Sequence, residues 1–221
     1  MHSWKRTATA MGTVAVLSAT SAPAPAHPHV FAEARLDVAI SKDSKVEALR
    51  HVWRFDDLFS STVLVEFDQN QDLELDADEL QEVANVVHES LAEFDYFQIV
   101  TDDGRDVAME PPEKLIADFT DNQLIILFES RPKEPLELQG KLDFGVYDPT
   151  FYTAIDFTED SYMAVENLPQ GCSREVIRPD PDEAIAQNQQ TLTDAFFNEP
   201  GGNDLSKIFA TKLEIQCSAN G

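Results

Sequence analysis

The chain has 221 residues, of which 41 are Asp or Glu and 16 are Lys or Arg, so its formal net charge is −25. So acidic a protein is a poor partner for nucleic acid or an anionic membrane, because all three carry negative charge. Its apolar content of 43% still suffices for a folded core, which excludes a disordered acidic protein. The length suits one domain of ordinary size or two small ones.

The first 26 residues have the features of a secretory signal peptide. Lys5 and Arg6 precede an uncharged stretch whose apolar centre covers residues 13–17, and small residues follow at 24–26. We therefore expect cleavage after Ala26. The product would be an exported, periplasmic protein with no later segment that spans a membrane.

A hairpin is predicted next, with apolar residues alternating over 36–40 and a partner strand over 46–55. Cleavage would leave His27 and His29 at the new N-terminus, and His51 lies in the second strand. If the hairpin brings these imidazoles together, they form a site suited to zinc, nickel, cobalt or copper. The alternative is an N-terminal tail and one strand histidine that bind no metal.

Residues 68–79 have the pattern of an EF-hand calcium loop between two predicted helices. The entering helix begins at Asp56 or Asp57 and ends near Phe67, and the exiting helix covers residues 76–94. Calcium takes roughly six to eight oxygen ligands, which such a loop supplies from alternate side chains and one backbone carbonyl. The predicted ligands are Asp68, Asn70, Asp72, Glu74 through its carbonyl, Asp76 and Glu79.

Leu73 departs from the EF-hand pattern. This sixth loop position normally holds Gly, because the chain turns there with a positive φ, and a branched side chain in that conformation costs on the order of 1 kcal/mol or more. We therefore expect weak calcium binding or a slightly different loop geometry. The alternative is an acidic turn before a helix, without an ion.

From Tyr96 onwards the apolar period changes to two, which predicts short strands in an antiparallel, sandwich-like region. A helix is expected over 182–197, a helical turn over 205–209, and a last strand or extended tail over 212–217. The predicted strands of this region are 97–99, 107–109, 115–117, 124–128, 136–146, 152–157 and 163–167. The fold class is therefore α+β. One unit, 27–95, holds the hairpin and the helix–loop–helix, and the other, 96–221, is rich in strands.

Cys172 and Cys217 are the two cysteines of the chain. An exported chain meets an oxidising compartment, so we expect them to form a disulfide. This bond would fasten the last strand to the rest of the C-terminal region.

Several stretches together resemble a bacterial family of exported proteins, domain-of-unknown-function family 1007. They are Ala-His-Pro-His-Val-Phe at 26–31, Leu-Arg-His-Val-Trp-Arg-Phe-Asp at 49–56, the acidic loop from Asp68, and Tyr-Asp-Pro-Thr-Phe-Tyr at 147–152. The family is commonly labelled the periplasmic component of an uncharacterised ABC-type transport system. Its members usually have Gly where this chain has Leu73. Genes of this kind are often found beside nickel, cobalt or zinc transporters, so the resemblance implies a metal-handling role by association.

We therefore expect a metal-binding accessory protein of a transition-metal transport system, with a calcium loop and a membrane metal transporter as partner. No enzyme is predicted, because the chain has no nucleophile elbow, phosphate loop, dinucleotide fingerprint or zinc-protease helix. One alternative is a calcium-stabilised structural or protein-interaction module with no transition-metal role. Another is a copper enzyme that uses an N-terminal His as a ligand.

Overall fold

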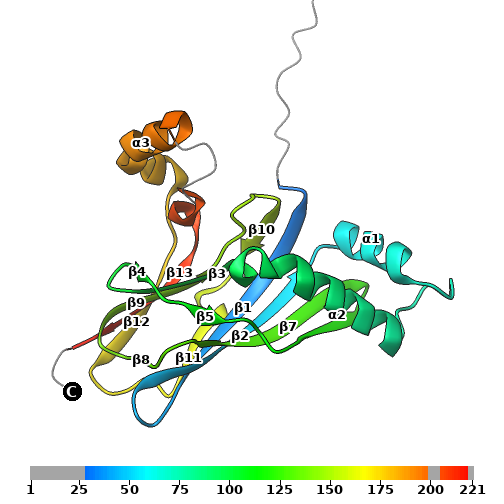
Figure 1. Cartoon of the computed structure of the whole chain (residues 1–221), viewed down its shortest axis with the longest axis horizontal. Helices are drawn as coiled ribbons and strands as arrows, with labels where there is room; N and C mark the ends of the chain where they lie inside the picture. Colours follow the sequence, from blue (N-terminus) through cyan, green and yellow to red (C-terminus); the bar gives the residue numbers. More distant parts are fainter. Residues whose placement is uncertain (1–27, 199–204, 219–221) are drawn as a thin grey trace, which may run out of the picture.

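The computed structural model describes residues 28–198 and 205–218, so the predicted signal peptide and His27 lie outside the described residues. Two β-sheets form the body, and α1 and α2 lie beside the larger one (Figure 1). The helices are α1 (Asp57–Phe67), α2 (Ala77–Ala92) and α3 (Pro181–Asn198), with short 3-10 turns η1 (Asp95–Phe97), η2 (Asp160–Tyr162) and η3 (Leu205–Phe209). The strands are β1 (Val30–Ile40), β2 (Lys45–Phe55), β3 (Gln98–Asp102), β4 (Arg105–Asp106), β5 (Met109–Glu110), β6 (Leu115–Thr120), β7 (Gln123–Pro132), β8 (Leu136–Glu137), β9 (Gly140–Val146), β10 (Thr153–Asp156), β11 (Met163–Glu166), β12 (Cys172–Ile177) and β13 (Lys212–Cys217).

The larger sheet is built around the predicted hairpin of β1 and β2. Its strand order is β10-β1-β2-β7-β5, with β11 also beside β1, β6 beside β7, and β8 beside β2. The hairpin therefore pairs directly with strands that follow residue 96, so both expected units, 27–95 and 96–221, contribute strands to this sheet. β10 and β11 run parallel to β1, whereas the sequence suggested only antiparallel pairing.

The smaller sheet has the order β12-β13-β9-β3-β4, and its neighbouring strands are antiparallel. Cys172 of β12 lies opposite Cys217 of β13, and their sulfur atoms are bonded at 2.03 Å. The predicted disulfide is thus confirmed, and it does fasten the last strand. Strand β12 itself was not predicted, because most of its side chains are exposed and give no clear apolar alternation.

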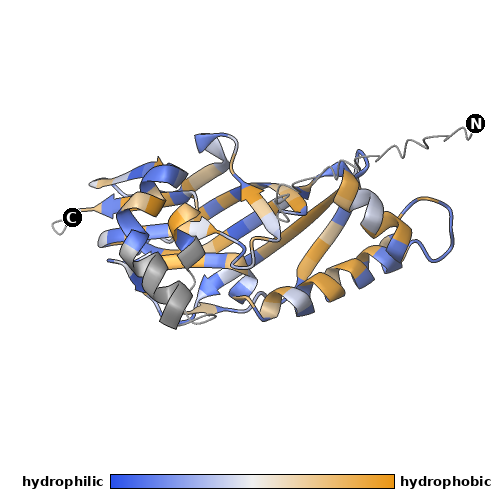
Figure 2. Ribbon diagram, turned by 90° about the horizontal axis from the view of Figure 1, so that it is seen from above, coloured by the Kyte–Doolittle hydropathy of each residue, from blue (hydrophilic) through white to orange (hydrophobic). Residues whose placement is uncertain are grey.

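Alternation along the strands decides which face of the larger sheet is buried. On β1, Leu36 and its even-numbered neighbours are buried, and on β2 the side chains of Leu49, His51 and Trp53 are buried on the same side. They form one core with residues of the smaller sheet, such as Phe144. A buried Leu or Phe contributes about 1.5–3 kcal/mol relative to its exposed state. Figure 2 shows the resulting alternation of hydrophobic and hydrophilic residues along the strands.

The two predicted helices around the acidic loop are confirmed within a few residues. Asp56 caps α1, because its carboxylate accepts hydrogen bonds from the N–H groups of Leu58 and Phe59. Asp76 and Glu79 form a capping box at the start of α2, which fixes where that helix begins. α2 lies over the larger sheet beside β6, and α1 lies beside β7 (Figure 1).

The turn η1 has a left-handed backbone conformation that the sequence does not predict. Asp95, Tyr96 and Phe97 follow one another with φ values of 50°, 55° and 58°. Such left-handed conformations cost L-residues about 1–2 kcal/mol each. Ring packing offsets this cost, because Phe97 stacks on Trp53 at 6.0 Å between ring centroids and Tyr96 lies 6.2 Å from Phe128.

Within the part of the chain that the structure describes, no helix is both long enough and apolar enough to cross a bilayer.

Candidate functional site

The acidic loop between α1 and α2 turns around the carboxylate of Asp68. Oδ1 of Asp68 accepts the N–H of Asp72 at 3.2 Å, and Oδ2 accepts the N–H of Leu73 at 2.9 Å. Gln71 and Leu73 have φ values of 63° and 66°. The positive φ expected at Leu73 is therefore present, and this residue carries the backbone strain that a Gly would avoid.

Glu79 closes the loop from the first turn of α2. Its side chain is buried, with Oε1 accepting the N–H of Gln69 at 2.8 Å and Oε2 accepting that of Asp76 at 2.9 Å. The two ends of the loop are thereby tied to one carboxylate, which can also face an ion.

The predicted calcium ligands are in order along the loop but are not gathered around one point. Within residues 28–198 and 205–218, no group of three or more His, Cys, Asp or Glu side chains is arranged to hold a metal. The carboxylates instead accept hydrogen bonds from nearby backbone N–H groups, as Asp72 does from Glu74 at 2.9 Å. Calcium would have to turn exposed side chains such as Asp72 and Asp76 inward.

The predicted histidine cluster is not assembled as expected. His51 lies opposite Leu36 in the hairpin, whereas His29 precedes the first residue of β1. Seven residues of extended strand separate positions 29 and 36, which is about 23 Å. The hairpin register therefore keeps His29 and His51 apart, and the third predicted ligand, His27, lies outside the described residues.

His29 lies exposed at one end of the larger sheet. The ring centroids of His29 and Tyr152 are 5.1 Å apart, and the backbone N–H of His29 donates to the backbone carbonyl of Tyr152 at 2.9 Å. A hollow of about 540 Å³ lies at the same end and is lined by Pro28, Phe151 and Phe209, among others. His29 is thus exposed, with the ring of Tyr152 beside its own.

His51 has the opposite environment. Only 1% of its surface is exposed, and its ring stacks on Phe128 at 4.4 Å between centroids. Burial lowers the pKa of His51 to about 3, and the neighbouring Gln98 side chain offsets this shift only in part. Among the described residues, neither of its ring nitrogens has a partner with hydrogen-bond geometry, and the same holds for Nε1 of Trp53. His51 is therefore a neutral core residue.

The exposed face of the larger sheet carries a groove that the sequence analysis missed. Its volume is about 470 Å³, and its wall is the segment that joins β5 to β6. The lining side chains of this face are Asp37, Arg50, Val52, Ile116, Leu127, Glu129 and Arg131, with Glu110, Glu113 and Lys114 from the wall. Asp and Glu are so frequent in this chain that their positions alone gave no signal, but Arg50 and Arg54, four residues apart on one predicted strand, would have marked this face.

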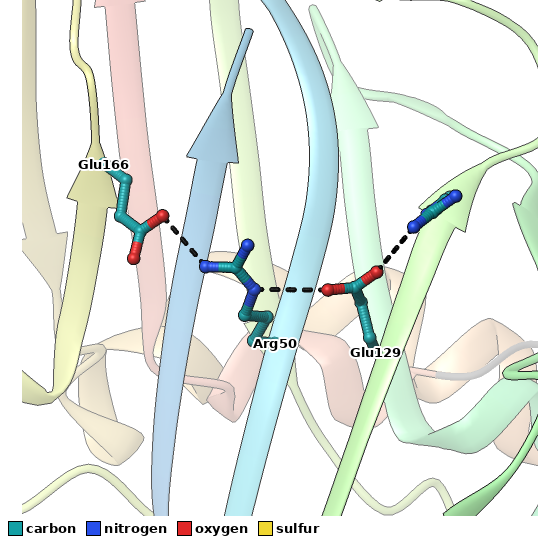
Figure 3. Close-up of polar contacts among 4 residues, drawn as sticks. Arg50, Glu129 and Glu166 are labelled. Atoms are coloured by element: carbon teal, nitrogen blue, oxygen red, sulfur yellow. Dashed lines mark hydrogen bonds and ion pairs between the residues drawn. The ribbon is translucent and has the colours of Figure 1, made fainter.

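A ladder of ion pairs crosses this face of the sheet, with Arg50 between Glu166 and Glu129 (Figure 3). Arg50 Nη1 is 2.8 Å from Glu166 Oε2, and Arg50 Nε is 3.1 Å from Glu129 Oε2. Arg131 then contacts the other oxygen of Glu129 at 2.9 Å. Hydrogen bonds from Arg131 and Arg50 lower the pKa of Glu129, and Glu129 and Glu166 raise the pKa of Arg50. These charges neutralise one another within the protein.

A family model described as "Protein of unknown function (DUF1007)" matches residues 12–217. The chain belongs to this family. A protein of Haemophilus influenzae, described as uncharacterized, is 25% identical over 195 residues, which is 87% of this chain and 91% of the relative. The resemblance seen in the sequence is confirmed for the DUF1007 family as such. The disulfide is consistent with an exported protein.

Proposed function

We propose that this protein is an exported, periplasmic metal-binding accessory protein, not an enzyme, and that its 68–79 loop binds one calcium ion. The observation that carries this proposal is the conformation of the loop. Its turn lies between two helices, the carboxylate of Asp68 stands at its centre, and positive φ occurs at Gln71 and Leu73. Oxygen-bearing side chains at alternate positions suit a hard cation.

We infer a weak calcium site. The loop already satisfies part of its own hydrogen bonding, and binding must displace contacts such as the one between Asp72 and the N–H of Glu74. Leu73 adds backbone strain. Both features favour the affinity range of extracellular calcium modules, with Kd on the order of 10⁻⁴–10⁻³ M.

For a transition metal, we propose His29 and His27 as ligands, without His51. The exposed position of His29 supports this choice, and the buried position of His51 argues against a third imidazole. Nickel, cobalt, zinc and copper all accept imidazole ligands. A role beside a membrane metal transporter follows from the family resemblance described above and is part of the same proposal.

Calorimetric titration of the mature protein tests both sites. Calcium should bind with a stoichiometry of one, and Glu79→Gln should weaken it about tenfold or more, because the site loses one of its charged ligands. Nickel or zinc should bind the wild type, and His29→Ala should abolish that binding without changing calcium binding. Equal calcium affinities of wild type and Glu79→Gln would contradict the calcium assignment.

The alternative function is a calcium-stabilised structural or interaction module with no transition-metal role. It is favoured by the separation of His29 from His51, which leaves no three-histidine site. Nickel and zinc binding by the wild type that is no tighter than binding by an unfolded control would decide for this alternative.

A further inference from the structure

Three large apolar side chains of α1 and the acidic loop are unusually exposed. Leu58 is 76% exposed, Val65 79% and Leu73 73%, whereas the next most exposed large apolar side chain of the described residues, Phe31, is 55% exposed. Figures 1 and 2 both place α1 and the loop at one end of the molecule. Apolar side chains so much more exposed than the rest, in so acidic a protein, indicate a contact surface.

Leu58, Ser61, Thr62 and Val65 form one side of α1, because helical residues three, four and seven apart share a face. We call these four residues the α1 face. Its two hydroxyl groups are satisfied within the helix, since Ser61 Oγ donates to the carbonyl of Asp57 at 2.6 Å and Thr62 Oγ1 to that of Leu58 at 3.0 Å. Removing water from the α1 face therefore leaves no polar group unpaired.

The α1 face has small side chains at its centre. Ser61 and Thr62 separate the larger side chains of Leu58 and Val65. Small residues between larger ones let another helix approach closely, with side chains fitting into the gap. The shape therefore suits a helix as the occupant.

The charged residues of α1 and its two ends are of one sign. Asp57 and Glu66 lie on the helix and Asp56 and Asp68 flank it, and we call these four residues the acidic rim. No Lys or Arg occurs between Arg54 and Arg105. A second copy of this chain or an anionic membrane would meet like charge here, whereas a basic partner would be attracted.

We propose that the α1 face docks a basic amphipathic helix of another protein. Apolar side chains of that helix cover Leu58 and Val65, and its Lys and Arg residues face the acidic rim. This is the helix-in-groove mode of recognition, with apolar anchors for affinity and opposite charges for orientation. The proposal does not depend on calcium or on the histidines.

The test uses a synthetic 14-residue peptide of Leu and Lys with Leu at helical spacing, and a scrambled peptide of the same composition. Binding is measured by fluorescence anisotropy with EDTA present, so that the calcium proposal is not tested at the same time. The patterned peptide should bind the wild type at least about tenfold more tightly than the scrambled one, and added salt should weaken it. Equal binding of the two peptides would overturn the proposal, because it would show general attraction of positive charge.

Two matched variants place the contact. Leu58→Ser with Val65→Ser should weaken the patterned peptide at least about tenfold, whereas Ile177→Ser with Ile185→Ser, which also removes two exposed apolar side chains, should leave it unchanged. Circular dichroism checks that both variants are folded. If both lose binding equally, the α1 face is not the site. If the wild type self-associates in sedimentation and only the Leu58/Val65 variant does not, the occupant is a second copy of this chain. If the wild type binds lipid vesicles and only the Leu58/Val65 variant does not, the occupant is a membrane. Either result would overturn the proposal.

Discussion

The helix–loop–helix segment (residues 57–92) and the two-sheet body differ in whether their acidic side chains are paired with Arg and in where backbone strain is exposed. In the body, Arg50 and Arg131 neutralise Glu129, and the buried His51 is uncharged. In the helix–loop–helix segment, no Lys or Arg is present, and the acidic loop carries its strain at an exposed Leu73. The body thus pairs some of its acidic side chains internally, whereas the segment has acidic side chains and no Lys or Arg of its own.

This difference assigns the two regions different roles. Ion pairs that are satisfied within the protein gain little from a ligand, so the ladder around Arg50 serves mainly to hold the sheet face in shape. Carboxylates without a cation nearby gain much from a metal ion or a basic partner. Changes in the body should therefore alter stability, and changes in the segment should alter binding.

The largest expected effect is in the body and concerns the disulfide. Cys172→Ser with Cys217→Ser opens a link across a sequence separation of 45 residues. The chain-entropy model gives a loss of about 4 kcal/mol for a loop of this length. Urea unfolding of the variant should show this loss, with calcium binding retained in the folded protein. A loss below about 1 kcal/mol would mean that β13 is held by packing alone.

The next largest effect is the loss of stability at low pH that His51 causes. Its folded pKa of about 3 lies below the unfolded value of about 6.5, so the unfolded state binds an extra proton as the pH falls between these values. The stability due to neutral His51 is complete above about pH 6.5 and falls by about 2 kcal/mol at pH 5. His51→Leu, which keeps a similar volume, should remove this part of the pH dependence.

Urea unfolding gives the loss of unfolding free energy between pH 7 and pH 5 for the wild type and for His51→Leu. The difference between the two losses is due to His51, because the carboxylates that both proteins share contribute equally to each. Phe128, Trp53 and Gln98 lie beside the ring and carry no charge. The same pH dependence in wild type and variant would show that His51 titrates normally and is not a sealed core residue.

A smaller effect is expected at Leu73 in the segment. Leu73→Gly removes the Cβ that makes its φ of 66° unfavourable, whereas Leu73→Ala retains it. The Gly variant should be more stable than the Ala variant by up to about 1 kcal/mol, although Gly normally costs stability. The reverse order in thermal unfolding would show that the loop is not held in this conformation.

The smallest effect is expected at the ladder. Arg50→Met removes two ion pairs whose side chains are roughly half exposed, and such pairs contribute less than about 1 kcal/mol each. Calcium and peptide binding at the segment should be unchanged. A large loss of stability would mean that the sheet face is more tightly coupled to the core than its exposure indicates.

The sequence predicted much of this fold because several signals were local. Apolar alternation located most strands, Asp56 or Asp57 was expected to cap α1, and helical spacing of apolar residues placed α2 from residue 76. The two cysteines of an exported chain predicted their disulfide. Pairing between distant strands was less accessible, so the parallel contacts of β10 and β11 with β1 were missed.

The expectation for His51 failed for a related reason. The hairpin was predicted, but its register was not, and the register places His51 opposite Leu36 and on the buried face. The left-handed turn at Tyr96 and Phe97 likewise depends on ring packing against Trp53 and Phe128, which no local pattern reveals. The acidic loop stays a prediction for calcium, because only its backbone and hydrogen bonds are described.

Hydrogen–deuterium exchange with and without calcium tests the contrast between the segment and the body most directly. Calcium should slow exchange at amides of the 68–79 loop and of the adjoining turns of α1 and α2, and it should leave β1, β2 and β7 unchanged. At a calcium concentration near the wild-type Kd, Glu79→Gln should lose most of this protection. Protection that is absent from residues 57–92, or that occurs instead in the strands of the body, would contradict the account.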